Sequence, residues 1–319
     1  MKKFFIALIS VLLLVGCGTT PSETTETTTE ETVETTESAA TGNIFVYTRD
    51  SSSGTREAFE KAIGLEELTA DAIEVSSNGD MITKVASDVN AIGYASLSTD
   101  FSNSGATPIN FEGVVPSSET VLDGSYGMQR PFSYVTRASG DFGSDDKEAI
   151  IAAFVDFLVN STEGLQVVQA AGGEVDLSKS TPWAELKKNH PIVDQDNSSL
   201  TIVTAGSTSV EKTLTAALEA FQPMAGNVQF TINQTGSSDG HKRTLGEEKD
   251  SVNAADIGFA SRNFKDEEDV SSALSSGVYC LDAVVAIVNA ENTAITDLTA
   301  EELAGIYSGE IKSWADLGK

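Results

Sequence analysis

The sequence predicts an α/β protein with two lobes, and three observations carry this prediction. About 275 residues follow the polar N-terminal region, which is long for one hydrophobic core and ordinary for two. Short β-branched apolar runs alternate with amphipathic helical patterns, which is typical of mostly parallel sheets. One order of elements is also written twice: "IFVYT", "SSSGT", a helix and "AIGYAS", and later "LTIVTA", "GSTS", a helix and "DIGFAS". Two such lobes would face each other across a cleft.

The first 42 residues are expected to lie outside this fold. Two lysines precede the apolar run "FFIALISVLLLVG", and "LVGC" resembles a bacterial lipobox. Residues 1–17 are therefore interpreted as a signal peptide, with cleavage before Cys17 and a lipid on its sulfur. The alternative is an ordinary secretory signal with an incidental cysteine. Residues 18–42 are rich in Thr and Glu and are predicted to form a disordered stalk at the extracytoplasmic face of the bacterial membrane.

The hydrophobic patterns place the elements of the fold. Helical spacing is clearest in 209–222, where apolar residues recur at three- and four-residue intervals and give one apolar face. Strands are predicted at 44–48, 91–96, 132–136, 200–205, 228–233, 256–261 and 283–289. Helices are predicted at 55–64, 145–160, 162–172, 209–222 and 299–309.

Composition excludes several classes of function. The formal net charge is -28, with 48 acidic and 20 basic residues, whereas nucleic-acid binding requires a basic surface. Besides Cys17 there is only Cys280, so no internal disulfide is expected. The two histidines and this cysteine lie far apart in sequence, so neither a metal site nor a cofactor is expected. If the protein binds an anion, local donors must hold it.

Polar turns at helix starts supply such donors. A helix N-terminus leaves backbone N–H groups unpaired and carries partial positive charge, and Ser53, Gly54 and Thr55 stand at one such start. Taken alone, this stretch is explained as a capped helix. However, "GSTS" (206–209) and "GSSDG" (236–240) also follow strands. Three such turns exceed what capping requires, and together they predict an anion site in the cleft.

These motifs resemble a known family. "AGSTSVEKTLTAALEAF", "QTGSSDGHK" and "LTAEELAGIYSGEIKSWADLG" look like the first half of the bacterial phosphate-binding protein of ABC transporters, and "TRDSSSGTREAFE" and "RPFSYVT" look like its second half. The resemblance implies a periplasmic-binding-protein-like (type II) fold with a hinge. It implies a monomer that captures inorganic phosphate, as hydrogen phosphate, and delivers it to an ABC permease. The protein would be no enzyme.

The order of the two halves is reversed relative to the family. This chain begins with the half carrying "SGTR" and ends at "WADLGK", which resembles a circular permutation. Lys319 and Asn43 should then be neighbours in one lobe. That lobe would hold 43–103 plus 290–319, and the other would hold 104–289. The chain would cross between the lobes near 100–107 and 286–291.

The resemblance also assigns residues to the phosphate. Arg49 matches a family arginine that pairs with the ligand. One position departs from the family: Arg262 stands where well-known members carry an aspartate that accepts the proton of hydrogen phosphate. Arg262 would either add positive charge toward phosphate or point to solvent, and Asp50 or Asp239 would be the acceptor. The other matching positions are Ser53, Gly54, Thr55, Ser207, Thr208, Ser209 and Ser237.

Two other classes of function stay open. "GSSDG" satisfies the nucleophile-elbow pattern with Ser238, but His190 precedes it and His241 lies three residues on, so neither suits a hydrolase triad. The cleft would equally suit another oxyanion, such as sulfate, molybdate or tungstate. The chain would otherwise be a phosphate-sensing surface protein.

Overall fold

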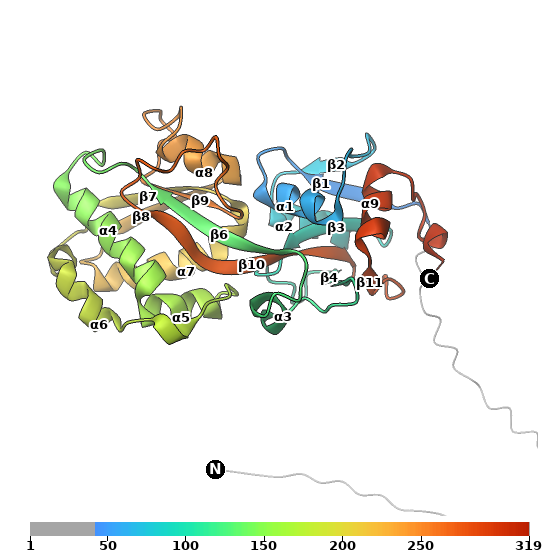
Figure 1. Cartoon of the computed structure of the whole chain (residues 1–319), viewed down its shortest axis with the longest axis horizontal. Coiled ribbons are helices and arrows are strands. Elements are labelled where there is room, and N and C mark those ends of the chain that lie inside the picture. Colours follow the sequence, from blue (N-terminus) through green and yellow to red (C-terminus); the bar gives the residue numbers. More distant parts are fainter. Residues whose placement is uncertain (1–41, 319) are drawn as a thin grey trace, which may run out of the picture. The chain divides into compact units, whose positions relative to one another are not determined.

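One nine-stranded β-sheet runs through the protein in the computed structural model, which describes residues 42–318 (Figure 1). The expected signal peptide, stalk and Cys17 lie outside the described residues. The strand order is β2-β1-β3-β10-β6-β9-β7-β8, with β4 also paired to β10. The strands are β1 (Phe45–Arg49), β2 (Ile73–Val75), β3 (Ala91–Ser96), β4 (Ala106–Pro108), β6 (Gln129–Thr136), β7 (Thr201–Gly206), β8 (Gln229–Gln234), β9 (Ile257–Ala260) and β10 (Ser276–Asn289); β5 (Asn110–Phe111) and β11 (Asp297–Leu298) form a separate pair.

The two ends of the sheet have the same architecture, as the repeated order of elements predicts. Strands β2, β1 and β3 are parallel, and so are β8, β7 and β9. The antiparallel strands β6 and β10 join these two groups. The predicted α/β class is therefore confirmed, with parallel pairing inside each group and antiparallel pairing where the groups meet.

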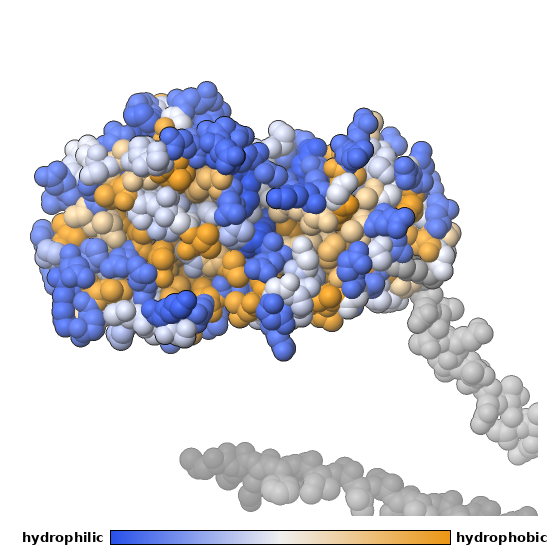
Figure 2. Space-filling view, in the orientation of Figure 1, coloured by the Kyte–Doolittle hydropathy of each residue, from blue (hydrophilic) through white to orange (hydrophobic). Residues whose placement is uncertain are grey.

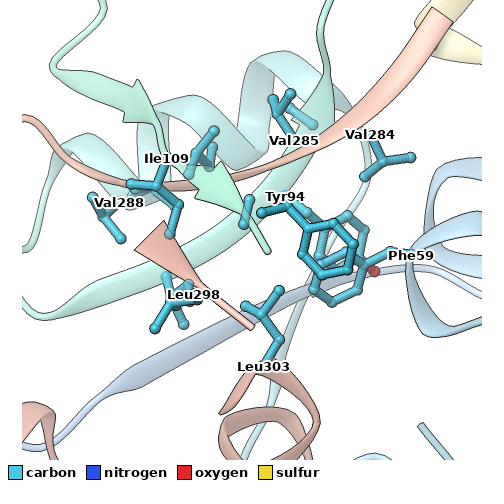
Figure 3. Close-up of a cluster of buried hydrophobic side chains, with 14 of the residues drawn as sticks. Phe59, Tyr94, Ile109, Val284, Val285, Val288, Leu298 and Leu303 are labelled. Carbon is cyan, nitrogen blue, oxygen red and sulfur yellow. The ribbon is translucent and has the colours of Figure 1, made fainter. Parts of the chain in front are cut away.

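Two hydrophobic cores define the lobes. The first lobe contains residues 43–128 and 283–318, whose apolar side chains form one cluster, and the second contains residues 132–280, which form the other. Phe59 stacks on Tyr94 in the first core, with ring centroids 4.2 Å apart (Figure 3). The chain thus passes between the lobes at 129–131 and at 281–282. Both passages lie in regular strands, β6 and β10.

The expected lobe boundaries are wrong. Residues 104–128 belong to the first lobe, because Ile109, Phe111 and Tyr126 pack in its core and β4 pairs with the far end of β10. Residues 283–289 also belong to that lobe. Residues 100–107, where the chain was expected to cross between the lobes, instead return it to the same sheet through β4. The long strand β10 carries no turn signal where it passes from one core to the other.

The predicted helices are present, with small differences at their ends. The α-helices are α1 (Gly54–Ile63), α2 (Asn78–Ala86), α3 (Ser118–Leu122), α4 (Asp145–Asn160), α5 (Thr162–Ala170), α6 (Trp183–Leu186), α7 (Glu211–Phe221), α8 (Ser237–Thr244) and α9 (Ala300–Ser308). Short 3₁₀ turns occupy Leu177–Lys179, Lys187–Asn189, Pro191–Asp194, Thr208–Val210, Gln222–Met224 and Trp314–Leu317. None of the helices within 42–318 has the length and apolarity needed to cross a bilayer.

The two ends of the described chain lie side by side. Ile44 N donates to Lys312 O at 2.8 Å, and Trp314 N donates to Gly42 O at 3.3 Å. Asn43 and Ser313 form an isolated antiparallel bridge. Both ends belong to the first lobe, as the sequence predicted.

Candidate functional site

The start of α1 faces the second lobe. Ser53 caps the helix, since its side chain accepts from Arg56 N. Thr55 has a different role, because its hydroxyl is 2.8 Å from that of Ser209 in the second lobe. Both side chains are buried. The polar stretch therefore caps the helix and also joins the two lobes.

Gly54 is required by the close approach of the lobes. A Cβ atom at this position would lie 2.3 Å from Ser237 Oγ and 3.0 Å from Ser261 Oγ, both in the second lobe. A distance of 2.3 Å does not occur at real Cβ atoms, so a side chain here would displace Ser237 or move the lobes apart at this point. Gly54 thus lets the backbone of the first lobe come close to serine hydroxyls of the second.

Four serines of the second lobe form a connected group beside Gly54. Ser207 Oγ donates to Ser261 Oγ at 2.9 Å and accepts from Ser209 N at 3.1 Å. Ser237 Oγ is 3.2 Å from Ser261 Oγ and accepts from Ser261 N at 3.0 Å. The turns after β7, β8 and β9 thus converge on one point, because the carboxyl ends of parallel strands meet at one edge of a sheet.

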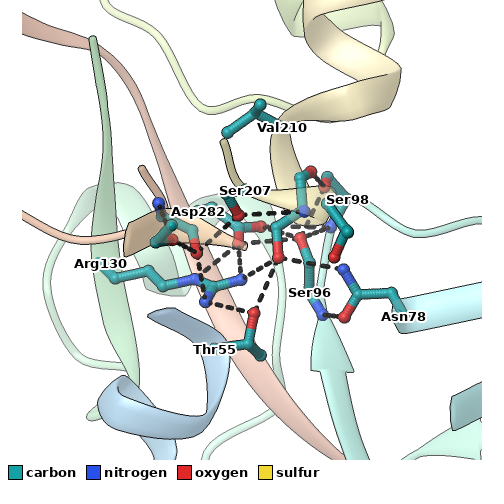
Figure 4. Close-up of polar contacts among 12 residues, drawn as sticks. Thr55, Asn78, Ser96, Ser98, Arg130, Ser207, Val210 and Asp282 are labelled. Carbon is teal, nitrogen blue, oxygen red and sulfur yellow. Dashed lines mark hydrogen bonds and ion pairs between the residues drawn. The ribbon is translucent and has the colours of Figure 1, made fainter. Parts of the chain in front are cut away.

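Arg130 lies at the centre of these hydroxyls, and the sequence prediction missed it (Figure 4). Its Nη1 is 2.9 Å from Thr55 Oγ1 and 3.2 Å from Ser261 Oγ, and its Nη2 is 3.0 Å from Ser209 Oγ. Its Nε and Nη2 also contact Asp282 Oδ2 at 2.9 and 2.8 Å. We name this group of residues the hydroxyl cluster: Thr55, Arg130, Ser207, Ser209, Ser237, Ser261 and Asp282.

Burial opposes both charges of the Arg130–Asp282 pair. Desolvation lowers the pKa of the Arg130 guanidinium and raises the pKa of the Asp282 carboxyl, and the attraction between the two groups counteracts each shift. The one signal in the sequence was a single charged residue in each of the two strands β6 and β10. Such charges are seldom buried unless they are paired.

Arg49 lies beside the cluster and is also buried. Its Nη1 is 3.4 Å from Thr208 Oγ1 in the second lobe, and its Nη2 donates to Ser76 O at 2.9 Å. Its Nε has no hydrogen-bond partner, although the side chain is only 1% exposed. Desolvation lowers the pKa of this guanidinium, with Asp50 opposing the shift. A buried N–H without a partner is costly, and a ligand at this place would satisfy it.

Arg262 does not join the cluster, and neither expectation for it is met. Its guanidinium is only 8% exposed and pairs with Glu268 at 2.6 Å and with Glu57 of the first lobe at 3.1 Å. Lys265 also reaches Glu57, at 2.9 Å. Arg262 therefore forms an ion pair between the lobes. No local sequence motif indicates that Glu57 and Glu268 lie beside it.

The two candidate proton acceptors also differ in position. Asp50 is 3.4 Å from Arg49 and accepts from Ser52 N at 2.9 Å, so it lies at the edge of the site. Asp239 instead pairs with Arg243 within α8, at 3.2 Å. Only Asp50 of the two therefore lies beside an arginine of the site.

A groove of about 880 Å³ adjoins the cluster. Asn78, Ser98 and Ser209 line its inner part, and Lys212 on α7 lines its wall. Asn78 Nδ2 donates to Ser209 Oγ at 3.0 Å, and Lys212 Nζ to Ser98 O at 3.2 Å, so these contacts also join the lobes. Figure 2 shows hydrophilic residues gathered where the two lobes meet. The groove therefore meets the hydroxyl cluster at Ser209.

Comparisons with known proteins agree with this architecture. Residues 191–319 match the family model described as PBP superfamily domain. The chain is 30% identical over 292 residues to phosphate-binding protein PstS 2 of Streptococcus agalactiae serotype V, covering 88% of this chain and 90% of that protein. It is 31% identical over 286 residues to PstS 2 of Streptococcus pneumoniae serotype 4, covering 86% and 88%. The solved structure of a phosphate-binding protein of a phosphate ABC transporter from S. pneumoniae TIGR4 superposes with a TM-score of 0.61 at 29% identity, over 86% of this chain and 99% of that one.

Proposed function

The chain belongs to the family of the phosphate-binding proteins PstS, with a two-lobed periplasmic-binding-protein-like fold, and from this premise we propose that it captures inorganic phosphate between its lobes. It then delivers the phosphate to the permease of an ABC transporter. The observation that carries the proposal is the hydroxyl cluster. Thr55 of one lobe meets Ser209 of the other beside two buried arginines. Such a set of donors recognises an anion by contact, whatever the charge of the outer surface.

The hydroxyls suit this task because each can reverse its role. A serine or threonine hydroxyl that now accepts a hydrogen bond from Arg130 can donate one to a phosphate oxygen after rotation. Backbone N–H groups at the starts of α1 and α8 add donors, and α8 begins without a side-chain cap. Each charge-assisted bond contributes about 1.5–3 kcal/mol, so a few of them give micromolar or tighter binding after ordering costs.

Closure of the lobes completes the site in this proposal. An open cleft admits the hydrated anion, and closure replaces its water with fixed donors from both lobes. The close approach of the lobes at Gly54, and the ion pairs of Glu57 with Arg262 and Lys265, belong to the closed form. The strands β6 and β10, which pass between the cores, would carry the hinge.

The surroundings of Ser238 also support binding of phosphate without a hydrolytic reaction. Its hydroxyl is 3.4 Å from Arg262 Nη2, and His241 Nε2 lies 3.1 Å from the backbone oxygen of Asp269. His241 therefore contacts this backbone oxygen and is not placed to act as a general base for Ser238. We therefore assign no hydrolytic step to the "GSSDG" turn.

The N-terminal assignments extend the proposal to the membrane. A lipid on Cys17, after cleavage of the signal peptide before this residue, would anchor the protein at the extracytoplasmic face of the cell membrane. The polar stalk 18–42 would let a monomeric binding unit reach the permease. Mass spectrometry of the protein from membranes tests this, because a lipid on an N-terminal Cys17 adds a defined mass.

We propose that the order of the two halves arose by circular permutation. Backbone hydrogen bonds join Ile44 to Lys312 and Gly42 to Trp314. The two ends of the chain therefore lie close enough for a short segment to connect them. Termini that are surface neighbours make such a rearrangement tolerable.

Calorimetric titration of the full-length protein in detergent micelles tests the function. We expect phosphate to bind with a dissociation constant in the micromolar range or below, and sulfate, molybdate and tungstate to bind more weakly. Tighter binding of one of these three would make the protein a receptor for that oxyanion. If no oxyanion binds, capture in this cleft is refuted. If phosphate binds, phosphate uptake by cells lacking the protein separates transport from sensing.

A further inference from the structure

Arg130 and Asp282 stand opposite each other at the passage between the lobes. Arg130 is the second residue of β6, and the antiparallel register of β6 and β10 places it directly across from Asp282. Both side chains are buried, at 3% and 0% exposure. The pair therefore belongs to the strands that connect the lobes and not to either helix start.

Asp282 has no capacity left for a ligand. Its Oδ2 accepts from Arg130 and from Ser96 Oγ at 2.8 Å, and its Oδ1 is 2.9 Å from Ser96 Oγ and 3.2 Å from Ser98 N. Each contact fixes the carboxylate further. Asp282 thus holds the guanidinium by its Nε edge, which fixes the direction of the remaining N–H groups.

The remaining N–H groups of Arg130 face hydroxyls only. Nη1 points to Thr55 and Ser261, and Nη2 points to Ser209 as well as to Asp282. Neutral hydroxyls are weaker partners for a buried cation than an anion is. Arg49 adds a second buried cation nearby, with an unpartnered Nε. Asp50, which pairs with Arg49 at 3.4 Å, is 26% exposed, so Asp282 is a fully buried carboxylate beside two buried guanidinium groups.

We propose that Arg130 binds the captured anion directly, through the N–H groups that now face Thr55, Ser209 and Ser261, and that Asp282 is its positioning residue. This inference rests on the proposed function and adds to it the principal cation of the site. A guanidinium fixed on one edge offers the other edge to two oxygens of a tetrahedral oxyanion. Because Arg130 lies on a connecting strand, both lobes close onto it.

The test uses variants that separate charge from folding. Arg130→Met alone would leave Asp282 buried without a partner and could unfold the protein. The double variant R130M/D282N removes both charges together, and R130K keeps the charge without the fork. Arg137→Met is the matched control, because Arg137 is also buried but pairs with Asp141 and Asp250 outside the site.

Phosphate binding and thermal unfolding are measured on the full-length protein in detergent. R130M/D282N should bind phosphate about 100-fold more weakly, and R130K about tenfold more weakly, as expected for lost charge-assisted bonds. Phosphate should raise the unfolding temperature of R137M but not of R130M/D282N.

Two results would overturn the inference. One is a folded R130M/D282N that keeps the phosphate affinity within about threefold of the parent. If that variant does not fold, an R130K variant with the parent's affinity has the same meaning. Failure of the parent itself to bind phosphate would instead refute the proposed function, so the two failures are distinguishable.

Discussion

Arg130 and Arg262 both lie where the lobes meet, and their surroundings are opposite in kind. Arg130 is in the interior of the cleft, with one carboxylate on one edge and hydroxyls of both lobes on the other. Arg262 is at the rim, where Glu268 and Glu57 surround it. An arginine that pairs with two carboxylates joins the lobes by ion pairs, whereas an arginine whose N–H groups contact hydroxyls is available to bind an anion.

The difference shows that residue type at a family position is a weak guide to role. Arg262 follows the sequence "DIGFAS" and was expected beside the anion, but its carboxylate partners come from another helix and from a nearby loop. The buried cation in the interior of the cleft is instead Arg130, which lies on β6 and not in one of the three polar turns. Substitutions can test whether contacts in the interior and contacts at the rim contribute differently to phosphate affinity.

The largest effect is expected from Gly54→Ala in the interior. The new Cβ would meet Ser237 and Ser261, so the lobes could not close fully. We expect phosphate affinity to fall about 100-fold, or about 2.7 kcal/mol, with little change in unfolding temperature. Gly79→Ala is the control, because only Ser77 Oγ, at 3.9 Å, lies within 4 Å of its Cβ. Equal affinities for both variants would contradict the close approach.

Thr55→Val should have a smaller effect. It keeps the shape of the side chain and removes the hydroxyl that joins Ser209 and Arg130. Loss of one bond to a charged partner costs about 1.5 kcal/mol, so titration should show roughly tenfold weaker phosphate binding. Thr83→Val in α2 is matched, since its hydroxyl bonds only to Gly79 O within the same helix. A Thr55→Val protein with unaltered affinity would remove this hydroxyl from the site.

At the rim, Glu57→Gln should change affinity only about threefold. The Glu57 side chain is 44% exposed, so its bridges to Arg262 and Lys265 are screened and contribute at most about 1 kcal/mol. The change should appear as faster phosphate release in stopped-flow measurements. Glu60→Gln is the control, because Glu60 pairs with Arg56 inside α1. A loss as large as that of Thr55→Val would erase the distinction between rim and interior.

Much of the fold could be predicted because local pattern determines it. The helix 145–160 has a cap, a dense apolar face and no breaker, and it occurs over that range. The convergence of Ser207, Ser209 and Ser237 with Thr55 followed from polar turns after parallel strands. These features depend on residues that are close in sequence, so a single sequence is enough to recognise them.

The missed features depend on register across the sheet. Arg130 and Asp282 are 152 residues apart, and only the pairing of β6 with β10 places them together. The lobe boundary failed for the same reason, since a 14-residue strand crosses between two cores without any turn. The partnership of Arg262 with Glu57 needs the closed arrangement of the lobes, which no local motif encodes.

The smallest effect is expected from exchanging the order of the two halves. A short linker would join residues 319 and 42, and the chain would be opened between Ser198 and Ser199, both exposed. Opening there spares Asn197, whose side chain donates to Ile192 O and Ala225 O and is buried. Neither the cleft interior nor its rim is touched, so phosphate affinity should stay within about twofold. A folded variant with much weaker binding would mean that the present chain order itself shapes the cleft, and the comparison of interior with rim would have to include the connecting strands.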